Sequence, residues 1–270
     1  MKKSKIYRTK KEIVEAFKES EEKILMAIYE CRLEKSKNTL QAICDLNNPR
    51  LACAYSHFIH REPLDILRKI CCLDPKYAYD YATMVDKGPR PETRFSAYQS
   101  PKDAYFYARN VYQKPTKGSR TASCKDPWYA YQYARDIDKK PMAETRDAAC
   151  MSPLYAYKYA MDIDKSPRKD TRKAACKDSQ LAYLYALKID KSPRKDTRQA
   201  ACKNLDHAYQ YVLYVDKEPR EDMENIICEH PIFKLYYDTW KYYLKKREED
   251  IKNGIEPENL DKKYFGVPFW

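Results

Sequence analysis

The 270-residue sequence contains few of the residue types on which phosphate-binding and catalytic sites usually depend. It has four glycines, which argues against a glycine-rich phosphate loop and against an all-β fold with many tight turns. The four histidines, His57, His60, His207 and His230, recur in no motif, and the patterns HExxH, GxSxG and paired CxxC are absent. We therefore expect no enzymatic activity, no cofactor and no metal site.

Long apolar segments are also missing. The N-terminus MKKSKIYRTKKEIVEAFKES lacks the apolar core of a secretory signal. No apolar run approaches the roughly 18 residues that a membrane helix needs. These features predict a cytoplasmic protein without a membrane partner. In that compartment the ten cysteines are expected to be reduced, buried thiols.

The residues that are abundant are tyrosine and the charged types. Of the 270 residues, 43% are hydrophobic and 34% are charged, and 26 are tyrosines. Tyrosine suits half-buried positions because its ring is apolar and its hydroxyl is polar. The formal net charge of +12 permits a nucleic acid or an acidic protein as partner, but it establishes neither.

An internal repeat organises most of the chain. Ala-Tyr pairs begin every 26 residues, at Ala78, Ala104, Ala130, Ala156, Ala182 and Ala208. In most copies a proline lies three residues before the alanine, and Asn, Asp or Ser precedes the proline. A degenerate copy is legible at Leu33–Ser36. A fixed period of this length is typical of a solenoid.

Each repeat is predicted to form two helices. Asp or Ser followed by proline is a helix N-cap followed by the first helical residue. In one copy a single helical face is formed by Ala156, Tyr159, Ala160 and Ile163. A second, short helix, PRKDTRKAACK, buries Ala174, Ala175 and Cys176. Six cysteines, including Cys176, occupy the same position of the 26-residue repeat, which we call a column. Packed helices lie roughly 10 Å apart, which is too far for these cysteines to form disulfides or to share a metal ion.

The sequence therefore predicts an all-α fold, an αα-hairpin solenoid of about eight to nine 26-residue repeats. Residues 1–47 are expected to form N-terminal capping helices with the degenerate repeat. Residues 48–229 form seven αα repeats, and residues 230–270 form a C-terminal capping helix with an aromatic tail.

The repeat resembles one found in uncharacterised bacteriophage proteins. The resemblance rests on the unit DP-x-YAY-x-YA-x-x-(I/V) and its period, from Asn48 to Glu229. The phage unit commonly continues IKGRWPEAE, whereas this chain has IDKSPRKDTR and no tryptophan there. The resemblance implies a viral source and a helical-repeat fold, with a location in the host cytoplasm or the virion. It supplies no catalytic residues.

One charged column has two interpretations. Aspartates recur at the end of the first helix, and arginines recur in the second helix, as in Asp190 and Arg172. They could form a ladder of ion pairs, or the arginines could face a groove and bind an anion.

The connectors between the two helices hold the first candidate binding residues. Stacking is expected to align these cations as a basic stripe: Lys139, Lys140, Lys165, Arg168, Lys169, Lys191, Arg194 and Lys195. Residues 152–177 carry seven basic and three acidic residues, whereas 204–229 carry two and seven. The stripe could be a solubilising edge or a binding site for nucleic acid or an acidic protein.

The tail KKYFGVPFW supplies the other candidate residues: Tyr264, Phe265, Phe269 and Trp270. It either packs on the last helices or docks into a partner. The favoured function is a non-catalytic scaffold that binds a host or viral protein, with the oligomeric state left open. The alternative is a nucleic-acid-binding module that uses the basic stripe.

Overall fold

The computed structural model describes residues 6–256, in which every regular element is a helix; Tyr7 and Leu33 form one isolated bridge. Contacts divide the chain into two compact units, residues 1–149 and 150–270. The predicted all-α fold of helix pairs in series is confirmed. The predicted boundaries at residues 47/48 and 229/230 remain predictions.

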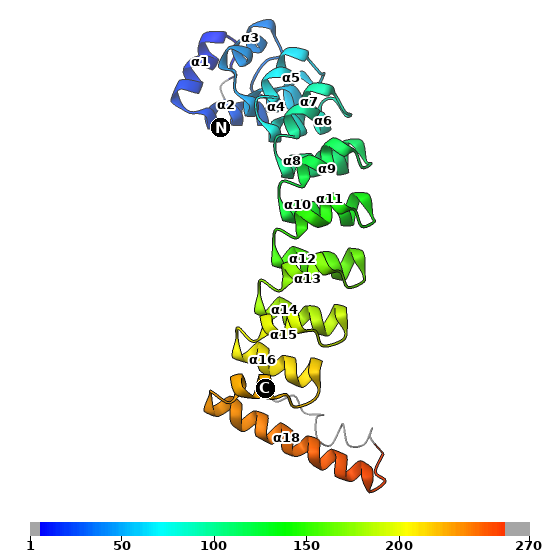
Figure 1. Cartoon of the computed structure of the whole chain (residues 1–270). Helices are drawn as coiled ribbons and strands as arrows, with labels where there is room; N and C mark the ends of the chain where they lie inside the picture. The colour runs from blue at the N-terminus through cyan, green and yellow to red at the C-terminus, as the bar shows by residue number, and fades with distance from the viewer. Residues whose placement is uncertain (1–5, 257–270) are drawn as a thin grey trace. The chain divides into compact units, whose positions relative to one another are not determined.

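The first unit begins with α1 (Lys10–Glu19), α2 (Glu21–Tyr29) and α3 (Lys37–Leu46). Four helix pairs follow, shown in cyan to green in Figure 1. Their first helices are α4 (Pro49–Tyr55), α6 (Pro75–Met84), α8 (Pro101–Phe106) and α10 (Pro127–Tyr133). Their second helices are α5 (Asp65–Cys71), α7 (Pro91–Ala97), α9 (Lys117–Ser123) and α11 (Ala143–Ala149).

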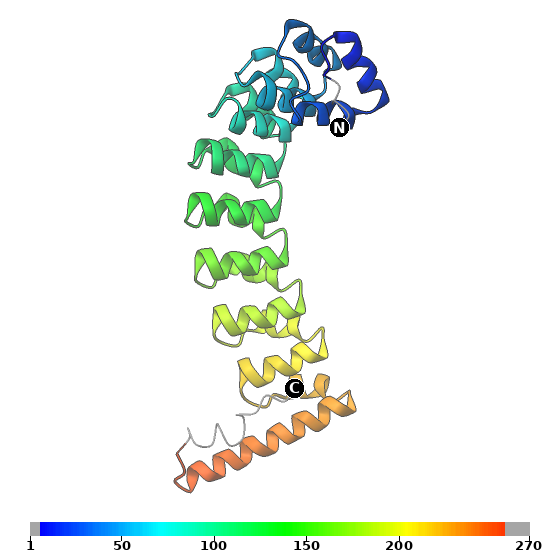
Figure 2. The same ribbon diagram turned by 180° about the vertical axis from the view of Figure 1, so that it is seen from behind.

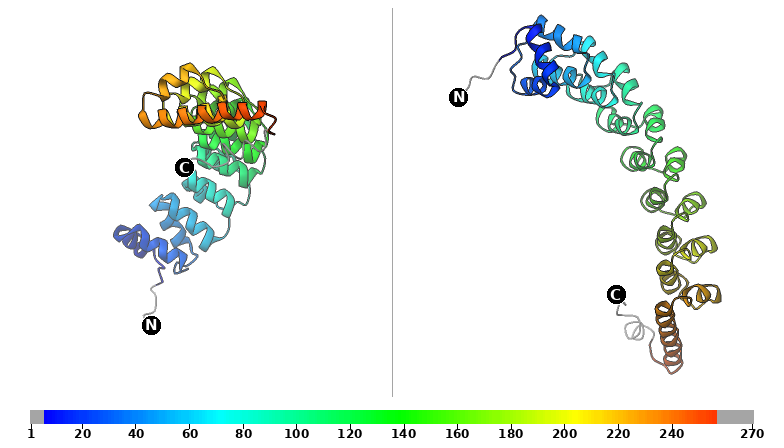
Figure 3. Two further views of the ribbon diagram at one scale, coloured as in Figure 1. Left: turned by 90° about the horizontal axis from the view of Figure 1, so that it is seen from below. Right: turned by 90° about the vertical axis from the view of Figure 1, so that its left-hand side faces the viewer.

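The second unit has three pairs and one long helix (Figure 2). The first helices are α12 (Pro153–Tyr159), α14 (Ser179–Tyr185) and α16 (Leu205–Tyr211), and the second helices are α13 (Lys169–Ala175), α15 (Lys195–Ala201) and α17 (Glu221–Ile227). The helix α18 (Pro231–Lys252) packs against α16 and α17. Seen end-on, the first and second helices of this unit lie in two rows (Figure 3, right).

The starts of the first helices follow the predicted local signals. Proline is the first helical residue in most of them, after an Asn, Asp or Ser N-cap. The carboxylate of Asp74 accepts from the backbone N–H of Lys76 at 2.9 Å. The second helices differ from the expectation at Pro167, because α13 begins at Lys169 with Arg168 as its N-cap. The connector proline thus precedes the cap.

The ends of the first helices depart from the predicted regular α-helix. In all but α6 a π-helical turn follows: η1 (Ser56–His60), η2 (Tyr107–Tyr112), η3 (Ala134–Asp138), η4 (Ala160–Asp164), η5 (Ala186–Asp190) and η6 (Val212–Asp216). The next residue is left-handed, as at Lys165 and Lys191, with φ of 51° and 52°. At Lys217 the backbone N–H reaches back to the carbonyl of Val212 at 2.8 Å. This wide turn ends the helix.

A column of tyrosines and alanines forms the core. One tyrosine per repeat has a fully buried side chain: Tyr55, Tyr81, Tyr107, Tyr133, Tyr159, Tyr185, Tyr211 and Tyr237. The alanines predicted to be inside, Ala156, Ala174 and Ala175, are buried, so helices can approach closely around the rings. Cys176 differs from the prediction, because it and the cysteines at the equivalent position of the other repeats are half-buried.

Candidate interaction surfaces

The arginines of the charged column pair with aspartates of the following repeat. Arg172 in α13 donates from Nε to the Oδ2 of Asp190 at 2.8 Å, and the side chain of Asp190 is fully buried. Equivalent pairs join Arg68 to Asp86, Arg120 to Asp138 and Arg198 to Asp216. In each pair the hydrogen bond with the aspartate raises the pKa of the arginine. These four arginines therefore form the ion-pair ladder and are not free to bind an anion.

Arg94 is the exception in this column. The residue equivalent to Asp86 and Asp138 is Tyr112, and Arg94 donates to its hydroxyl at 3.1 Å. Arg94 is exposed. The repeat spanning residues 100–125 therefore lacks one acidic residue of the ladder, and it carries six basic residues and one acidic residue.

The hydroxyls of six of the buried tyrosines accept a hydrogen bond from the backbone N–H of a connector: Tyr81, Tyr107, Tyr133, Tyr185, Tyr211 and Tyr237. Tyr185 of α14 accepts a hydrogen bond from the backbone N–H of Arg168 at 3.0 Å, and its hydroxyl lies 2.8 Å from Oγ1 of Thr171. Tyr211 makes the same contact with the N–H of Arg194 at 3.0 Å. Because these bonds reach the N-cap of α13 or α15 from the next pair, they fix each connector relative to its neighbour.

The candidate cations of the second unit occupy three equivalent positions in two successive connectors. Lys165 and Lys191 are the left-handed residues, Arg168 and Arg194 are the N-caps, and Lys169 and Lys195 are the first helical residues. All six side chains are exposed. In the first unit, Lys139 is likewise the left-handed residue, and both Lys139 and Lys140 are exposed.

Acidic side chains offset only part of this positive charge. Arg168 lies 3.6 Å from Asp170, and Arg194 lies 3.8 Å from Asp190, which already pairs with Arg172. A hollow of about 550 Å³ is lined by Arg172, Pro193, Arg194, Lys195, Asp196 and Gln199. Arg194 and Lys195 therefore line the same hollow as Arg172 of the ion-pair ladder.

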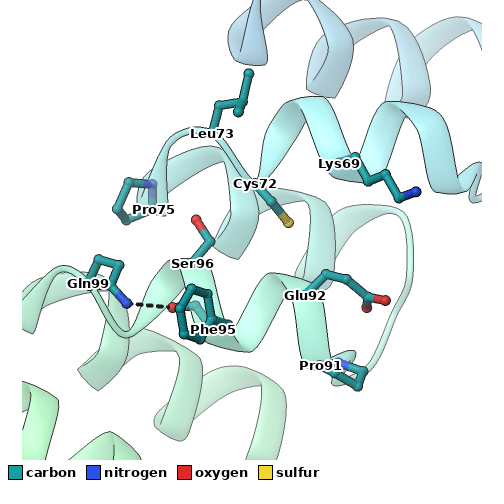
Figure 4. Close-up of a pocket in the computed structure, with 9 residues that line it drawn as sticks. All are labelled: Lys69, Cys72, Leu73, Pro75, Pro91, Glu92, Phe95, Ser96 and Gln99. Atoms are coloured by element: carbon teal, nitrogen blue, oxygen red, sulfur yellow. Dashed lines mark hydrogen bonds between the residues drawn. The ribbon is translucent and has the colours of Figure 1, made fainter.

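A second hollow, of about 620 Å³, lies between α5 and α7 in the first unit (Figure 4). It is lined by Cys72, Leu73, Pro75, Pro91 and Phe95 and by the polar residues Lys69, Glu92, Ser96 and Gln99. Leu73 and Phe95 are 62% and 73% exposed. The amide of Gln99 donates to the carbonyl of Phe95 at 3.2 Å.

Sequence reasoning did not select Leu73 or Phe95. The signal was available in the repeat columns, because the residues equivalent to Phe95 are Lys69, Thr121, Asp147, Lys173, Gln199 and Asn225. Because the other repeats pack with a polar residue at this position, the packing of the helix pairs does not require Phe95 to be apolar. Its exposure in the structure shows that the core does not use it.

The cysteines differ in burial from exposed to fully buried, and the thiols of Cys53 and Cys71 are hydrogen-bonded to each other. All ten are free thiols, and burial raises the pKa of Cys176 to about 11 and that of Cys124 to about 12. Across residues 6–256, no cluster of His, Cys, Asp and Glu has metal-binding geometry. In the same range, no helix is both long and apolar enough to cross a membrane. The tail residues Tyr264, Phe265, Phe269 and Trp270 lie outside the described range.

Comparison with known proteins gives no match: the chain matches no family model, no curated protein and no solved structure.

Proposed function

We propose that this chain is a non-catalytic helical-repeat protein that binds a protein partner. The observation that carries the proposal is the hollow between α5 and α7. Two apolar side chains that line it, Leu73 and Phe95, are largely exposed, and the charged residues Lys69 and Glu92 line it too. Exposed large apolar side chains together with charged ones are typical of protein–protein interfaces. The bacteriophage source implied by the repeat remains part of the proposal.

The partner that fits this hollow is a protein segment presenting one or two apolar side chains. Phe95 offers an aromatic face and Leu73 an aliphatic one, while Lys69 and Glu92 offer charges of both signs. The rigid helix pairs keep the hollow preformed, because Tyr81 in α6 holds the backbone N–H of Leu64, at the start of α5, at 2.8 Å. A preformed site loses less entropy on binding.

The test compares variants rather than searching for any bound protein. Proteins from the cells that contain this chain are captured on the native chain and quantified by mass spectrometry. With Leu73→Ser and Phe95→Ser, capture of the specific partner should fall about 30-fold or more, since an interface anchor contributes about 2 kcal/mol or more.

The matched control is Met151→Ser with Met161→Ser. These methionines are 57% and 50% exposed, and Met151 occupies the repeat column of Leu73. The control should retain the partner. If the native chain and the Leu73/Phe95 variant capture the partner equally, the hollow is not the partner-binding site.

Nucleic-acid binding is the second candidate, favoured by the six exposed cations of the second unit at equivalent positions of two successive connectors. We infer that, if these cations bind nucleic-acid phosphates, a variant with Gln at four of the positions will bind nucleic acid more weakly and with a smaller salt dependence. The four changed residues are Arg168, Lys169, Arg194 and Lys195. For each phosphate that the variant no longer neutralises, the slope of log K against log salt should fall by about 0.9 for duplex DNA.

The assay is fluorescence anisotropy of a labelled DNA duplex and a labelled single strand between low and physiological salt. The control changes four exposed lysines outside both candidate surfaces to Gln: Lys11, Lys18, Lys37 and Lys245. An equal loss of affinity in both variants would indicate a general charge effect. No binding by the native chain at low salt would reject this candidate.

A further inference from the structure

Two arginines in the π-helical turns of the first unit depart from the composition of their repeat column. Arg109 lies in η2 and Arg135 lies in η3, at equivalent positions of successive repeats. The residues at the other equivalent positions are apolar, threonine or histidine: His57, Thr83, Met161, Leu187, Leu213 and Thr239. Because those repeats pack without an arginine here, the packing of the helix pairs does not require Arg109 or Arg135.

Each of these arginines lies over the ring of a tyrosine one helical turn earlier. The guanidinium carbon Cζ of Arg109 is 5.9 Å from the ring centroid of Tyr105, and that of Arg135 is 5.3 Å from the ring centroid of Tyr131. The tyrosines are buried, whereas the arginine side chains are 54% and 44% exposed. The cation–π contact therefore holds each guanidinium group at the surface while part of it faces water.

The two guanidinium groups share one carboxylate. Arg135 donates from Nε to Oδ1 of Asp136 at 2.7 Å and from Nη2 to Oδ2 at 3.2 Å. The Nη1 atom of Arg109 lies 3.8 Å from Oδ2 of the same carboxylate, which is beyond hydrogen-bond distance. Within residues 6–256, Asp136 is the only acidic residue that forms an ion pair with either arginine. These three side chains therefore carry a surplus of one positive charge.

The hydroxyl of Tyr105 fixes the carboxylate of Asp136. It donates to Oδ2 of Asp136 at 2.6 Å and accepts from Nη1 of Arg109 at 2.9 Å. Burial, followed by the bond to Asp136, raises the pKa of Tyr105 to about 12, so the hydroxyl keeps its proton at neutral pH. The network joins α8 and η2 to η3 of the next pair. Both arginines are thus oriented before a ligand binds, which lowers the entropy cost of binding.

We propose that Arg109 and Arg135 bind a carboxylate of the protein partner, supplied by an Asp or Glu side chain. The proposal rests on the proposed function for the source of that carboxylate. A guanidinium group matches a carboxylate in shape, and the chain itself uses this pairing between repeats, as in Arg120 and Asp138. Arginine is also one of the residue types that contribute most to binding in protein interfaces.

The charge and the burial of the site favour a carboxylate over a phosphate. One surplus positive charge fits a single carboxylate, whereas a phosphate monoester on a protein carries about 1.5 to 2 negative charges at neutral pH. A single-stranded nucleic acid would need aromatic faces on which its bases could stack. Tyr105 and Tyr131 cannot offer such faces, because they are only 3% and 4% exposed.

The test is NMR of the arginine side-chain Nε–H groups in the full isotope-labelled chain, titrated with acetylated and amidated tetraglutamate. Arg109→Lys and Arg135→Lys each remove one signal and so assign both. The two signals should shift and saturate together. In Arg109→Gln, the dissociation constant measured at Arg135 should rise about fivefold or more, because one charged donor is lost. Circular dichroism checks that this exposed substitution leaves the helices folded.

The matched control is Arg90→Gln, which removes one exposed arginine from the N-cap of α7. It should leave the dissociation constant at Arg109 and Arg135 unchanged, and tetraglutamine should shift neither signal. The proposal is overturned if tetraglutamate shifts neither signal, or if Arg90→Gln weakens binding as much as Arg109→Gln. It is also overturned if a phosphoserine peptide or oligothymidylate saturates both signals at a lower concentration than tetraglutamate, since the preferred ligand is then a phosphate.

Capture of the partner separates this site from the hollow between α5 and α7. Arg109→Gln with Arg135→Gln should lower capture about fivefold or more, and Arg90→Gln should retain it. If only the Leu73/Phe95 variant loses the partner, the proposed function stands and the carboxylate does not come from that partner, which overturns this proposal. If only the Arg109/Arg135 variant loses the partner, the arginine site stands and the hollow is not the binding site.

Discussion

Neutralising Asp190 tests whether the buried ladder stabilises the array. Asp190 lies at the end of η5, its side chain is fully buried, and Arg172, whose side chain is 11% exposed, donates to it from Nε and Nη2. Asp190→Asn keeps the shape of the side chain and removes its charge. The guanidinium of Arg172 is then left largely buried without a counter-charge.

The size of the effect follows from the burial of the pair. Removing one partner of a buried ion pair typically costs about 3–5 kcal/mol. The lower end applies here, because the amide oxygen of asparagine still accepts one hydrogen bond and the guanidinium edge reaches water. We therefore expect about 3 kcal/mol of destabilisation. Arg172→Met should also destabilise, and the double variant should cost about 2 kcal/mol less than the sum, since no buried charge is left alone.

The assay is urea unfolding followed by helical circular dichroism, with the full two-by-two cycle measured under one condition. The control is Asp170→Asn, whose pair with Arg168 is 3.6 Å long with side chains 39% and 47% exposed. An exposed pair of this kind contributes at most about 1 kcal/mol. The reasoning is refuted if Asp190→Asn costs no more than Asp170→Asn, or if the cycle with Arg172→Met is additive.

Three further predictions concern the connectors, the pH dependence and the thiols. Lys165→Gly should raise the free energy of unfolding, measured with urea, by about 0.5–1 kcal/mol, because glycine adopts the left-handed φ of 51° freely. The control, Lys169→Gly, removes the same charge inside α13 and should lower the free energy of unfolding. Burial raises the pKa of Tyr183 to about 12 and that of Cys176 to about 11, above their ordinary values of 10.0 and 9.0. The unfolded state then releases these protons first, so the urea midpoint should fall as pH rises from about 9 to 12, and a flat midpoint would contradict this linkage. Iodoacetamide should modify exposed Cys31 at least about tenfold faster than half-buried Cys176, as peptide mapping would show, and equal rates would contradict the burial of Cys176.

The sequence alone was enough to predict the helix pairs, because the signals that start and align them are local. Proline after Asn, Asp or Ser marks a helix start within two residues, and Ala156, Tyr159 and Ala160 share a face by simple helical geometry. The exposure of Arg168 and Arg194 followed from their place in a polar turn. Partner identity does not follow in this way, since a polar turn has the same composition whether it binds or only solubilises.

Only the tertiary structure decided which residues meet across repeats. Arg172 pairs with Asp190, 18 residues later, and Tyr185 holds the N–H of Arg168, 17 residues earlier. Those contacts depend on the stacking register of successive pairs, which no local signal encodes. The same register brings Leu73 and Phe95 into the lining of one hollow. The 26-residue period thus determined that the pairs stack, while the register of stacking determined which side chains are used in internal contacts and which remain exposed.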